Sequence, residues 1–251
     1  MSKSNGAILF EGNSLLDNTP IVVLLTGLQT PSNNTKTGWM LQTYVIRQDI
    51  APTEAVKQGL DFSICGSCPL RGKSGDRTCY VNLVPINNVW RKYQAGDYPY
   101  ANNEILQNIK RRSMPLRITA YGDAAATPFD ACLPLLSVVS RWTGYTHQWR
   151  NCDRRWQNYL MESVESNEDR VKANSLGWRT FRALLPEEKP SVGELMCTHV
   201  AHPQVQCESC GLCSGTSSKT HLDIVDPVHG LQWKKEAFRK VKKYETTIIL
   251  E

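Results

Sequence analysis

The chain has 251 residues, of which 41% are hydrophobic and 21% charged, values typical of a globular protein with a sizeable core. Its net charge of +5 is below that of a dedicated nucleic-acid binder, so nucleic acid is retained only as an alternative partner. No apolar run approaches the roughly 20 residues of a membrane helix, and the N-terminus lacks an export-signal pattern. We therefore expect a cytoplasmic protein with no membrane partner, whose reduced cysteines bind metal more often than they form disulfides.

The predicted elements alternate along most of the chain. In chain order, hydrophobic periodicity and Gly/Pro punctuation predict strands at 20–29, 40–47, 79–83, 115–121, 143–149, 161–164 and 177–184, and helices at 52–60, 102–112, 128–142, 154–160 and 166–174. Strands that alternate with helices of about ten residues favour a parallel sheet with right-handed crossovers.

This alternation predicts an α/β protein with a partial or complete (β/α) barrel-like parallel sheet, similar to a TIM barrel; an open doubly wound sheet is the alternative. Residues 186–190 (PEEKP) are interpreted as a linker between a barrel-like domain, 1–190, and a cysteine-rich metal-binding segment, 191–251. A basic helix over 232–244 and a strand over 246–250 are predicted to close the chain.

Seven of the nine cysteines fall into two groups with the spacing of metal ligands. The first group is Cys65, Cys68 and Cys79, in a loop over 65–79, and the second is Cys197, Cys207, Cys210 and Cys213. The second group contains a compact Cys-x2-Cys-x2-Cys run, which favours a [4Fe–4S] cluster. Zinc is the alternative, because His199 and His202 lie in the same segment.

The three cysteines of the first group would leave one iron of a [4Fe–4S] cluster open to a small molecule. Tyr80, next to Cys79, is a candidate cofactor-binding residue, because an aromatic ring beside a cluster excludes water. The alternative is a zinc loop whose fourth ligand comes from Cys132, Cys152 or a histidine. The sequence does not decide whether the two groups share one centre.

Several polar residues follow predicted strands, where chemistry collects in this fold class. Gly122 and Asp123 are candidate cofactor-binding residues, because glycine admits a ligand to the backbone and the acid would bind a hydroxyl or an amine. Helix capping is the alternative for Asp123, which we also count with His147 and Lys36 as a candidate catalytic residue. Glu162, Glu165, Arg179 and Arg182 are expected to converge on the same rim.

Four of these segments together resemble a phage protein family known as gene product 88. They are Asn34 to Gly38, the cysteine loop that ends in Cys79-Tyr80, Arg117 to Asp123, and the run from Cys207 to Cys213. The layout is also similar to that of radical-SAM enzymes, in which a three-cysteine cluster precedes a partial barrel. The first loop differs, with Cys-x2-Cys-x10-Cys in place of the usual Cys-x3-Cys-x2-Cys.

The resemblance and the cysteines together predict a bacteriophage iron–sulfur protein in the host cytoplasm. One or two [4Fe–4S] clusters, with S-adenosylmethionine as a further cofactor, would support radical-SAM-like or related redox chemistry on an unidentified substrate. The alternative function is a zinc-stapled accessory protein that binds nucleic acid or a host factor without catalysis. Oligomeric state is not predicted.

Overall fold

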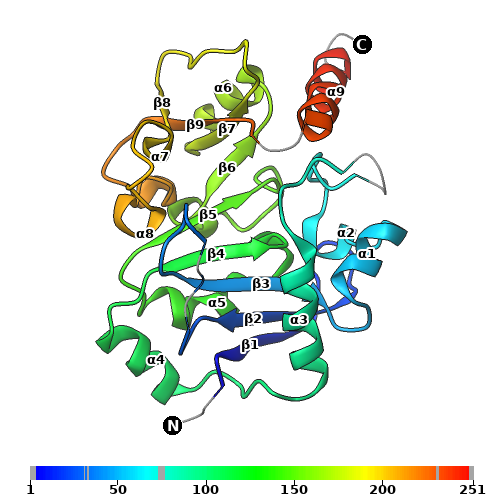
Figure 1. Ribbon diagram of the computed structural model, residues 1–251, viewed down its shortest axis with the longest axis vertical. Helices are drawn as coiled ribbons and strands as arrows, with labels where there is room; N and C mark the ends of the chain where they lie inside the picture. The colour runs from blue at the N-terminus through cyan, green and yellow to red at the C-terminus, as the bar shows by residue number, and fades with distance from the viewer. Residues whose placement is uncertain (1–3, 31, 33, 73–76, 230–231, 249–251) are drawn as a thin grey trace.

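The computed structural model describes residues 4–30, 32, 34–72, 77–229 and 232–248, with side chains up to residue 242. Its centre is one sheet of nine strands, in the order β1-β2-β3-β4-β5-β6-β7-β9-β8 (Figure 1). The strands are β1 Gly6–Asn13, β2 Pro20–Thr26, β3 Leu41–Arg47, β4 Leu116–Tyr121, β5 Trp142–Thr146, β6 Met161–Val164, β7 Thr180–Leu184, β8 Glu194–Met196 and β9 Asp223–Pro227.

The sheet has an antiparallel end and a longer parallel part. The pairs β1–β2 and β2–β3 are antiparallel, whereas every pair from β3 onward is parallel. β1 and β8 lie at opposite edges, so the sheet is open and a complete barrel does not form. The prediction of an α/β protein with a mostly parallel sheet is confirmed. The sheet also continues past residue 190, because β9 pairs with β7 and β8 pairs with β9.

Short helices connect the strands. They are α1 Pro52–Gln58, α2 Phe62–Cys65, α3 Leu83–Gln94, α4 Asn103–Arg111, α5 Phe129–Leu136, α6 Asn167–Ser175, α7 Thr198–Ala201, α8 Cys207–Cys210 and α9 Gln232–Ile248, with 3-10 turns η1 Ala124–Ala126, η2 Arg154–Asn158 and η3 Gly215–Ser217. Two helix starts are readable from the sequence, since Asn102 accepts a bond from the Ile105 amide and Ser166 one from the Asp169 amide.

Two apolar clusters hold most of the molecule together. The larger one joins strand residues such as Leu116 and Ile118 to Ile109 of α4, Phe129 of α5 and Trp156 of η2. The second joins β2 and β3 to α2 and α3, with Ile64 and Ile86 among its buried members. These apolar contacts hold in place the ends of the strands, where the predicted polar site residues lie.

Most predicted elements from 20 to 184 are confirmed, with shifted ends. The helix predicted over 128–142 ends at Leu136, because a turn follows and Trp142 begins β5. Residues 79–82 form no strand, and Leu83 is already the first residue of α3. The side chain of Asn82 caps the start of this helix. At the C-terminus, α9 continues through residues 246–248, so the predicted final strand is wrong there, and residues 249 and 250 lie outside the described part.

The strands β1, β8 and β9, the helix α3 and several one-turn helices were not predicted. β8 and β9 are short and flank the second cysteine group, where ligand spacing hides the strand pattern. Among the described residues, no helix combines the length and the apolar character needed to cross a membrane.

Candidate functional site

The first cysteine group is held against the end of β5. Asp123 donates its amide to the carbonyl of Ile64 (2.6 Å), and Gln148 donates its side-chain amide to the carbonyl of Cys65 (3.1 Å). Gly66, with φ +54°, has no room for a side chain, because a Cβ would lie 2.5 Å from the Gln148 amide oxygen. The cysteine loop therefore sits at the carboxyl ends of the parallel strands.

The three cysteines of the first group interact with one another. Burial raises the pKa of Cys65 well above its usual value, and neighbouring Cys68 and Cys79 add to the shift. The Cys68 sulfur also lies 4.0 Å from Nε2 of His147. Cys132 is not part of this group; it is buried in the larger core, 3.8 Å from the Thr127 hydroxyl.

His147 connects the first cysteine group to an acid. Its Nε2 lies 3.0 Å from Glu165 as well as 4.0 Å from Cys68. Burial disfavours the imidazolium, but Cys68 and Glu165 outweigh it, and the pKa of His147 is raised well above its usual value. Since both partners face one ring nitrogen, the three residues do not form a relay in which acid and nucleophile use opposite nitrogens.

Asp123 has a positioning role in this structure. Its carboxylate accepts bonds from the amides of Ala125 (3.0 Å) and His147 (2.9 Å) and from the hydroxyl of Thr146 (2.8 Å). Helix capping, the alternative interpretation, thus accounts for the Asp123 side chain. The same carboxylate also fixes the His147 amide. Gly122 is required by the backbone, because at φ +80° a Cβ would lie 2.6 Å from the Val45 carbonyl.

Tyr80 lies beside the C-terminal helix. Its ring stacks on His229, with centroids 4.8 Å apart, and the Lys234 ammonium of α9 lies 5.5 Å from the ring centre. Lys234 also donates to the carbonyl of Cys79 (2.9 Å). Phe238 packs α9 onto a small cluster with Leu185, Val228 and Leu70. The basic helix predicted from the sequence is therefore a neighbour of the first cysteine group.

The second cysteine group lies over the middle of the sheet. Its four cysteines come from two segments and line one cavity of about 30 Å³. Tyr145, Phe181 and Ile224, from β5, β7 and β9, supply part of the wall. About 10–15 Å³ is enough for one water-sized group, so the cysteines surround usable space. His199 also lines the cavity, and its Nδ1 lies 2.9 Å from the Val205 carbonyl, whereas His202 is exposed.

The loop over residues 34–39 clasps the second group. The amide of Cys207 donates to the carbonyl of Lys36 (3.0 Å), and the amide of Glu208 donates to that of Thr37 (3.1 Å). Glu208 in turn accepts a bond from the amide of Trp39 (2.5 Å). Gly38 leaves room for this approach, because at φ +74° a Cβ would lie 2.6 Å from the Glu208 carboxyl carbon. Two segments about 170 residues apart in sequence thus form one unit.

Two arginines bind the carbonyls of the second group. Exposed Arg141 donates to the carbonyls of Glu208 and Ser209, both at 2.8 Å. Buried Arg179 donates to the carbonyls of Leu212 (2.9 Å) and Gly215 (2.8 Å), on either side of Cys213, and to that of Leu222. These arginines satisfy carbonyls that would otherwise lack partners in a tightly wound loop.

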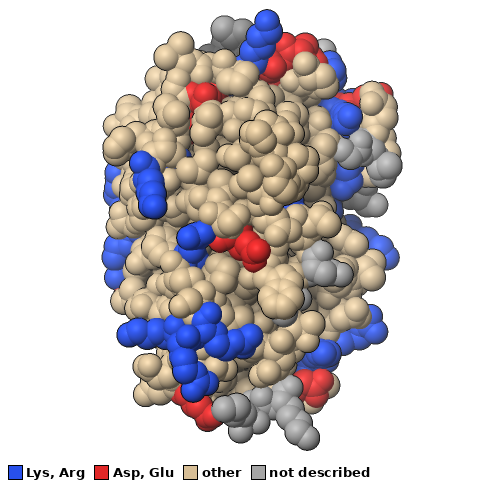
Figure 2. Space-filling view, turned by 60° about the vertical axis from the view of Figure 1, so that its left-hand side comes forward, with Lys and Arg blue, Asp and Glu red and all other residues tan. Residues whose placement is uncertain are grey.

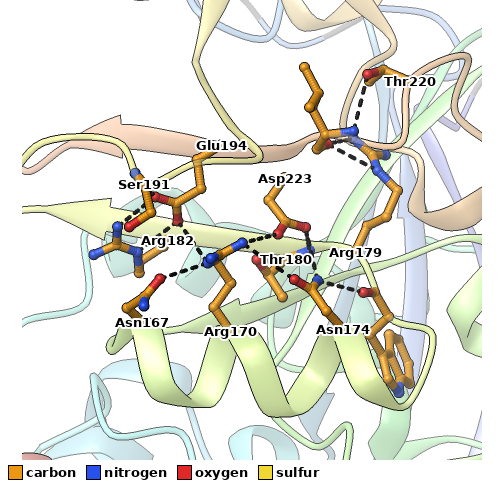
Figure 3. A network of polar contacts seen from close by, with 12 residues as sticks. Asn167, Arg170, Asn174, Arg179, Thr180, Arg182, Ser191, Glu194, Thr220 and Asp223 are labelled. Carbon is orange, nitrogen blue, oxygen red and sulfur yellow. Dashed lines mark hydrogen bonds and ion pairs between the residues drawn. The ribbon is translucent and has the colours of Figure 1, made fainter.

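Arg179 borders a buried polar network (Figure 3). Arg182 donates two bonds to Glu194 (2.8 and 2.6 Å), and Arg170 pairs with Asp223 (3.2 Å). The Asp223 carboxylate also accepts the amide of Thr180 (2.7 Å). Arg182 therefore joins β7 to β8, whereas Arg179 binds the loop of the second group and the residue before β9. Arg182 and Glu165 both act on the Lys242 charge, and Glu165 acts on Glu162, so Arg182, Glu165 and Glu162 lie near one another.

Positive charge surrounds the second group. Lys36 lines the cavity and pairs with Asp226 at 2.5 Å. Burial raises the pKa of Cys197 and of Cys207, to about 11 for Cys207, while the Lys36 charge acts to lower both. Arg117 of β4 also acts on Cys207. Lys36 therefore belongs with the second group rather than with Asp123 and His147.

Glu162 is a second buried acid near the first group. It is fully buried, and neither carboxyl oxygen has a hydrogen-bond partner. Burial raises its pKa to about 11, so the carboxyl is neutral at ordinary pH. Its strand neighbours are Thr146 and Thr180, whereas Glu165 pairs with His147.

The predicted site residues thus divide into two places. Asp123, His147, Gly122 and Tyr80 lie with the first cysteines, and Lys36 lies with the second. In the described ranges, no three or more His, Cys, Asp or Glu side chains are arranged to hold a single metal ion. Sequence reasoning missed Tyr145, Arg117 and Arg141, whose partners are distant in the chain and leave no local signal.

No protein-family model, no curated protein and no solved structure matches this chain. The residues and their geometry are therefore the basis on which a function is proposed.

Proposed function

We propose that the chain is an iron–sulfur protein that holds a [4Fe–4S] cluster between Cys197, Cys207, Cys210 and Cys213. The observation that carries this proposal is the single cavity which all four cysteines line. Thiolates are the ligands that iron–sulfur clusters require, and a cube needs space between its ligands, whereas zinc draws four ligands onto one atom. The compact Cys-x2-Cys-x2-Cys run supports the same choice.

The surroundings of this cavity suit an anionic cluster. Lys36 and Arg117 place positive charge near Cys207, and the hydroxyl of Thr198 lies 3.9 Å from the Cys210 sulfur. Phe181 and Ile224 limit access of water from the sheet side. Charge, hydrogen bonding and solvent exposure set the reduction potential of such clusters.

The first group is proposed to hold a second, reactive cluster through Cys65, Cys68 and Cys79. It lies at the carboxyl ends of the parallel strands, where enzymes of this class place their chemistry. Three thiolates leave one coordination position for a substrate or a cofactor. When bound, such a cluster supplies one-electron redox chemistry. The His147–Glu165 pair, 3.0 Å apart, would hold a proton beside it.

S-adenosylmethionine is the cofactor proposed for this position. Six parallel strands follow one another in the sheet in chain order, β3-β4-β5-β6-β7-β9, and the three-cysteine loop lies between the first and the second of them, after α1. This order supports the layout of a partial barrel of the radical-SAM type, on the resemblance to gene product 88 and to radical-SAM enzymes. Reductive cleavage of S-adenosylmethionine by protein purified without oxygen is the direct test, and wild-type activity in Cys68→Ala would contradict it.

The first experiment is a measurement of iron, sulfide and zinc in protein purified without oxygen, with a visible absorption spectrum. We expect about eight irons with matching sulfide and a broad charge-transfer band. Cys210→Ala should lose about half of both, whereas Cys132→Ala, which removes a core thiol, should lose none. Stoichiometric zinc without iron would refute the proposal.

The alternative is an accessory protein that binds nucleic acid without catalysis, and a basic surface favours it. Figure 2 shows Lys and Arg side chains gathered toward the end of the molecule that carries α4. Lys110, Arg111 and Arg112 are all exposed there. The cations of α9 are less available, since Lys234 and Arg239 already have protein partners. Binding of a labelled oligonucleotide that weakens steeply with salt, and is lost in Arg111→Ala, would support this function.

A further inference from the structure

Five consecutive residues, 144–148, contact both cysteine groups. On the side of the second group, the amide of Gly144 donates to the carbonyl of Cys213 at 3.3 Å. Tyr145 and Cys213 line the same cavity of that group. Gly144 has no room for a side chain, because a Cβ would lie 2.5 Å from Leu160. The Cys213 end of the loop is therefore seated directly on β5.

The next residues of the same segment contact the first group. Nε2 of His147 lies 4.0 Å from the sulfur of Cys68, and the Gln148 side chain donates to the carbonyl of Cys65. The amide of His147 is fixed in turn by Asp123. The two contacts, at 4.0 and 3.1 Å, involve the two cysteines of the Cys-x2-Cys pair.

Tyr145 and His147 are two residues apart, which corresponds to roughly 7 Å along an extended chain. The Tyr145 side chain lines the cavity of the second group, and the His147 side chain lies 4.0 Å from a sulfur of the first. The strongest cysteine neighbours of Cys65 and of Cys213 nevertheless belong to their own groups. Two separate centres thus stand next to each other, joined by one step of β5.

We propose that β5 couples the two centres: they exchange electrons directly through the Tyr145–His147 step, and Tyr145 is a positioning residue that adjusts the potential of the second centre. This inference rests on the proposed function, since it requires a cluster at each group. Hydrogen bonds to cluster sulfurs raise the reduction potential, because they stabilise the more negative, reduced state.

The coupling is tested by electron paramagnetic resonance on the chemically reduced protein. Two reduced clusters this close should give a split or broadened signal through their magnetic interaction. Cys68→Ala and Cys210→Ala should each give the simple signal of one isolated cluster. If wild-type protein contains both clusters and its spectrum is the plain sum of the two variant spectra, the inference is overturned while the proposed function stands.

The role of Tyr145 is tested by a redox titration of Tyr145→Phe. This variant keeps the ring, which packs on Phe181 with centroids 4.7 Å apart, and removes only the hydroxyl. We expect unchanged iron content and a lower potential for the second cluster alone. Tyr98→Phe, which alters a buried tyrosine in the β2–β3 core, is the matched control and should shift neither potential.

The possible results distinguish failure of the inference from failure of the proposed function. A lowered potential in Tyr145→Phe together with a coupled wild-type spectrum supports the inference. An unchanged potential with full iron content removes Tyr145 from the role proposed for it. Protein that binds no iron under anaerobic reconstitution overturns both the inference and the proposed function.

Discussion

The two cysteine groups differ in how the fold holds them. The second group lies on the face of the sheet, and its backbone is bound by the loop 34–39 and by Arg141 and Arg179. The first group lies at the strand ends, beside His147 and Glu165, with α9 next to its last cysteine. Main-chain clamps fix a centre rigidly, whereas titratable side chains make its surroundings reactive. This difference supports the proposal of a structural or relay centre at the second group and a reactive centre at the first.

Arg179→Ala should cause the largest loss of stability, because it removes the buried arginine that binds main-chain carbonyls around the second group. The change leaves the carbonyls of Leu212, Gly215 and Leu222 without their donor, and each unsatisfied buried group costs about 1–3 kcal/mol. We expect the free energy of unfolding to fall by roughly 3 kcal/mol or more. Denaturant unfolding followed by circular dichroism measures this change.

Arg141→Ala is the matched control for the clamp, since it binds carbonyls of the same segment from an exposed position. Water replaces its bonds, so the loss should be about 1 kcal/mol or less. Equal losses of unfolding free energy in the two variants would show that the burial of Arg179 does not make its bonds worth more than those of exposed Arg141.

Glu162→Gln should stabilise the protein in a pH-dependent way near the first group. The pKa of Glu162 rises from a usual value of 4.5 to about 11 in the folded state, so the folded protein keeps a proton that the unfolded chain releases. Wild-type stability therefore falls as pH rises above the unfolded value. The variant should gain on the order of 5 kcal/mol at pH 8, which is about 3.5 pH units above the unfolded value, and little at pH 4, as thermal unfolding at both pH values would reveal.

A flat difference between the two proteins across this pH range would mean that Glu162 is charged in the folded state. Glu168→Gln, in the first turn of α6, is the control for a generic change of charge, and it should show no such trend.

Lys36→Met should slow alkylation of the second group in metal-free protein. The Lys36 charge lowers the pKa of Cys197 and Cys207, so its removal leaves less thiolate at pH 8. We expect a decrease of about two- to tenfold at these two cysteines, since one pKa unit is a tenfold change. Cys68 should react as before, as should all thiols in Lys110→Met; site-resolved mass spectrometry follows each one.

Lys234→Ala should have the smallest effect and concerns the first group. It removes one bond to the Cys79 carbonyl and the ammonium beside Tyr80, at a cost of about 1 kcal/mol or less. Alkylation of Cys79 should become slower, because the Lys234 charge lowers the pKa of the Cys79 thiol, while that of Cys213 stays unchanged. A change at Cys213 instead would argue that α9 acts through the fold and not on the first group.

The sequence predicted correctly those strands that have regular apolar runs bounded by Gly or Pro. β2, β3 and β4 combine β-branched residues with Gly or Pro at their ends, and all three appear where they were expected. β8 and β9 were missed, because β9 owes its existence to pairing with β7, and β8 to pairing with β9, rather than to local propensity. The helix predicted over 128–142 was too long, because the chain turns after Leu136 and the strand β5 begins at Trp142.

The candidate site was predicted in its chemistry but not in its arrangement. Cysteine spacing within each group is a local property, and both groups do gather in space. Asp123 stands at a strand end as expected, yet its three hydrogen bonds make it a positioning residue for His147. The contacts of Arg141 and Arg179 with main-chain carbonyls carry no signature in the sequence.

The sequence by itself determined two things about this protein: the alternating α/β pattern and two sets of thiols spaced like ligands. Both are properties of neighbouring residues, because periodicity and ligand spacing act over a few positions. Only the tertiary structure decided that the loop 34–39 joins the second group, that Glu162 is buried without a partner, and that β5 contacts both groups. These depend on sheet order and crossover geometry, which bring together segments separated by most of the chain.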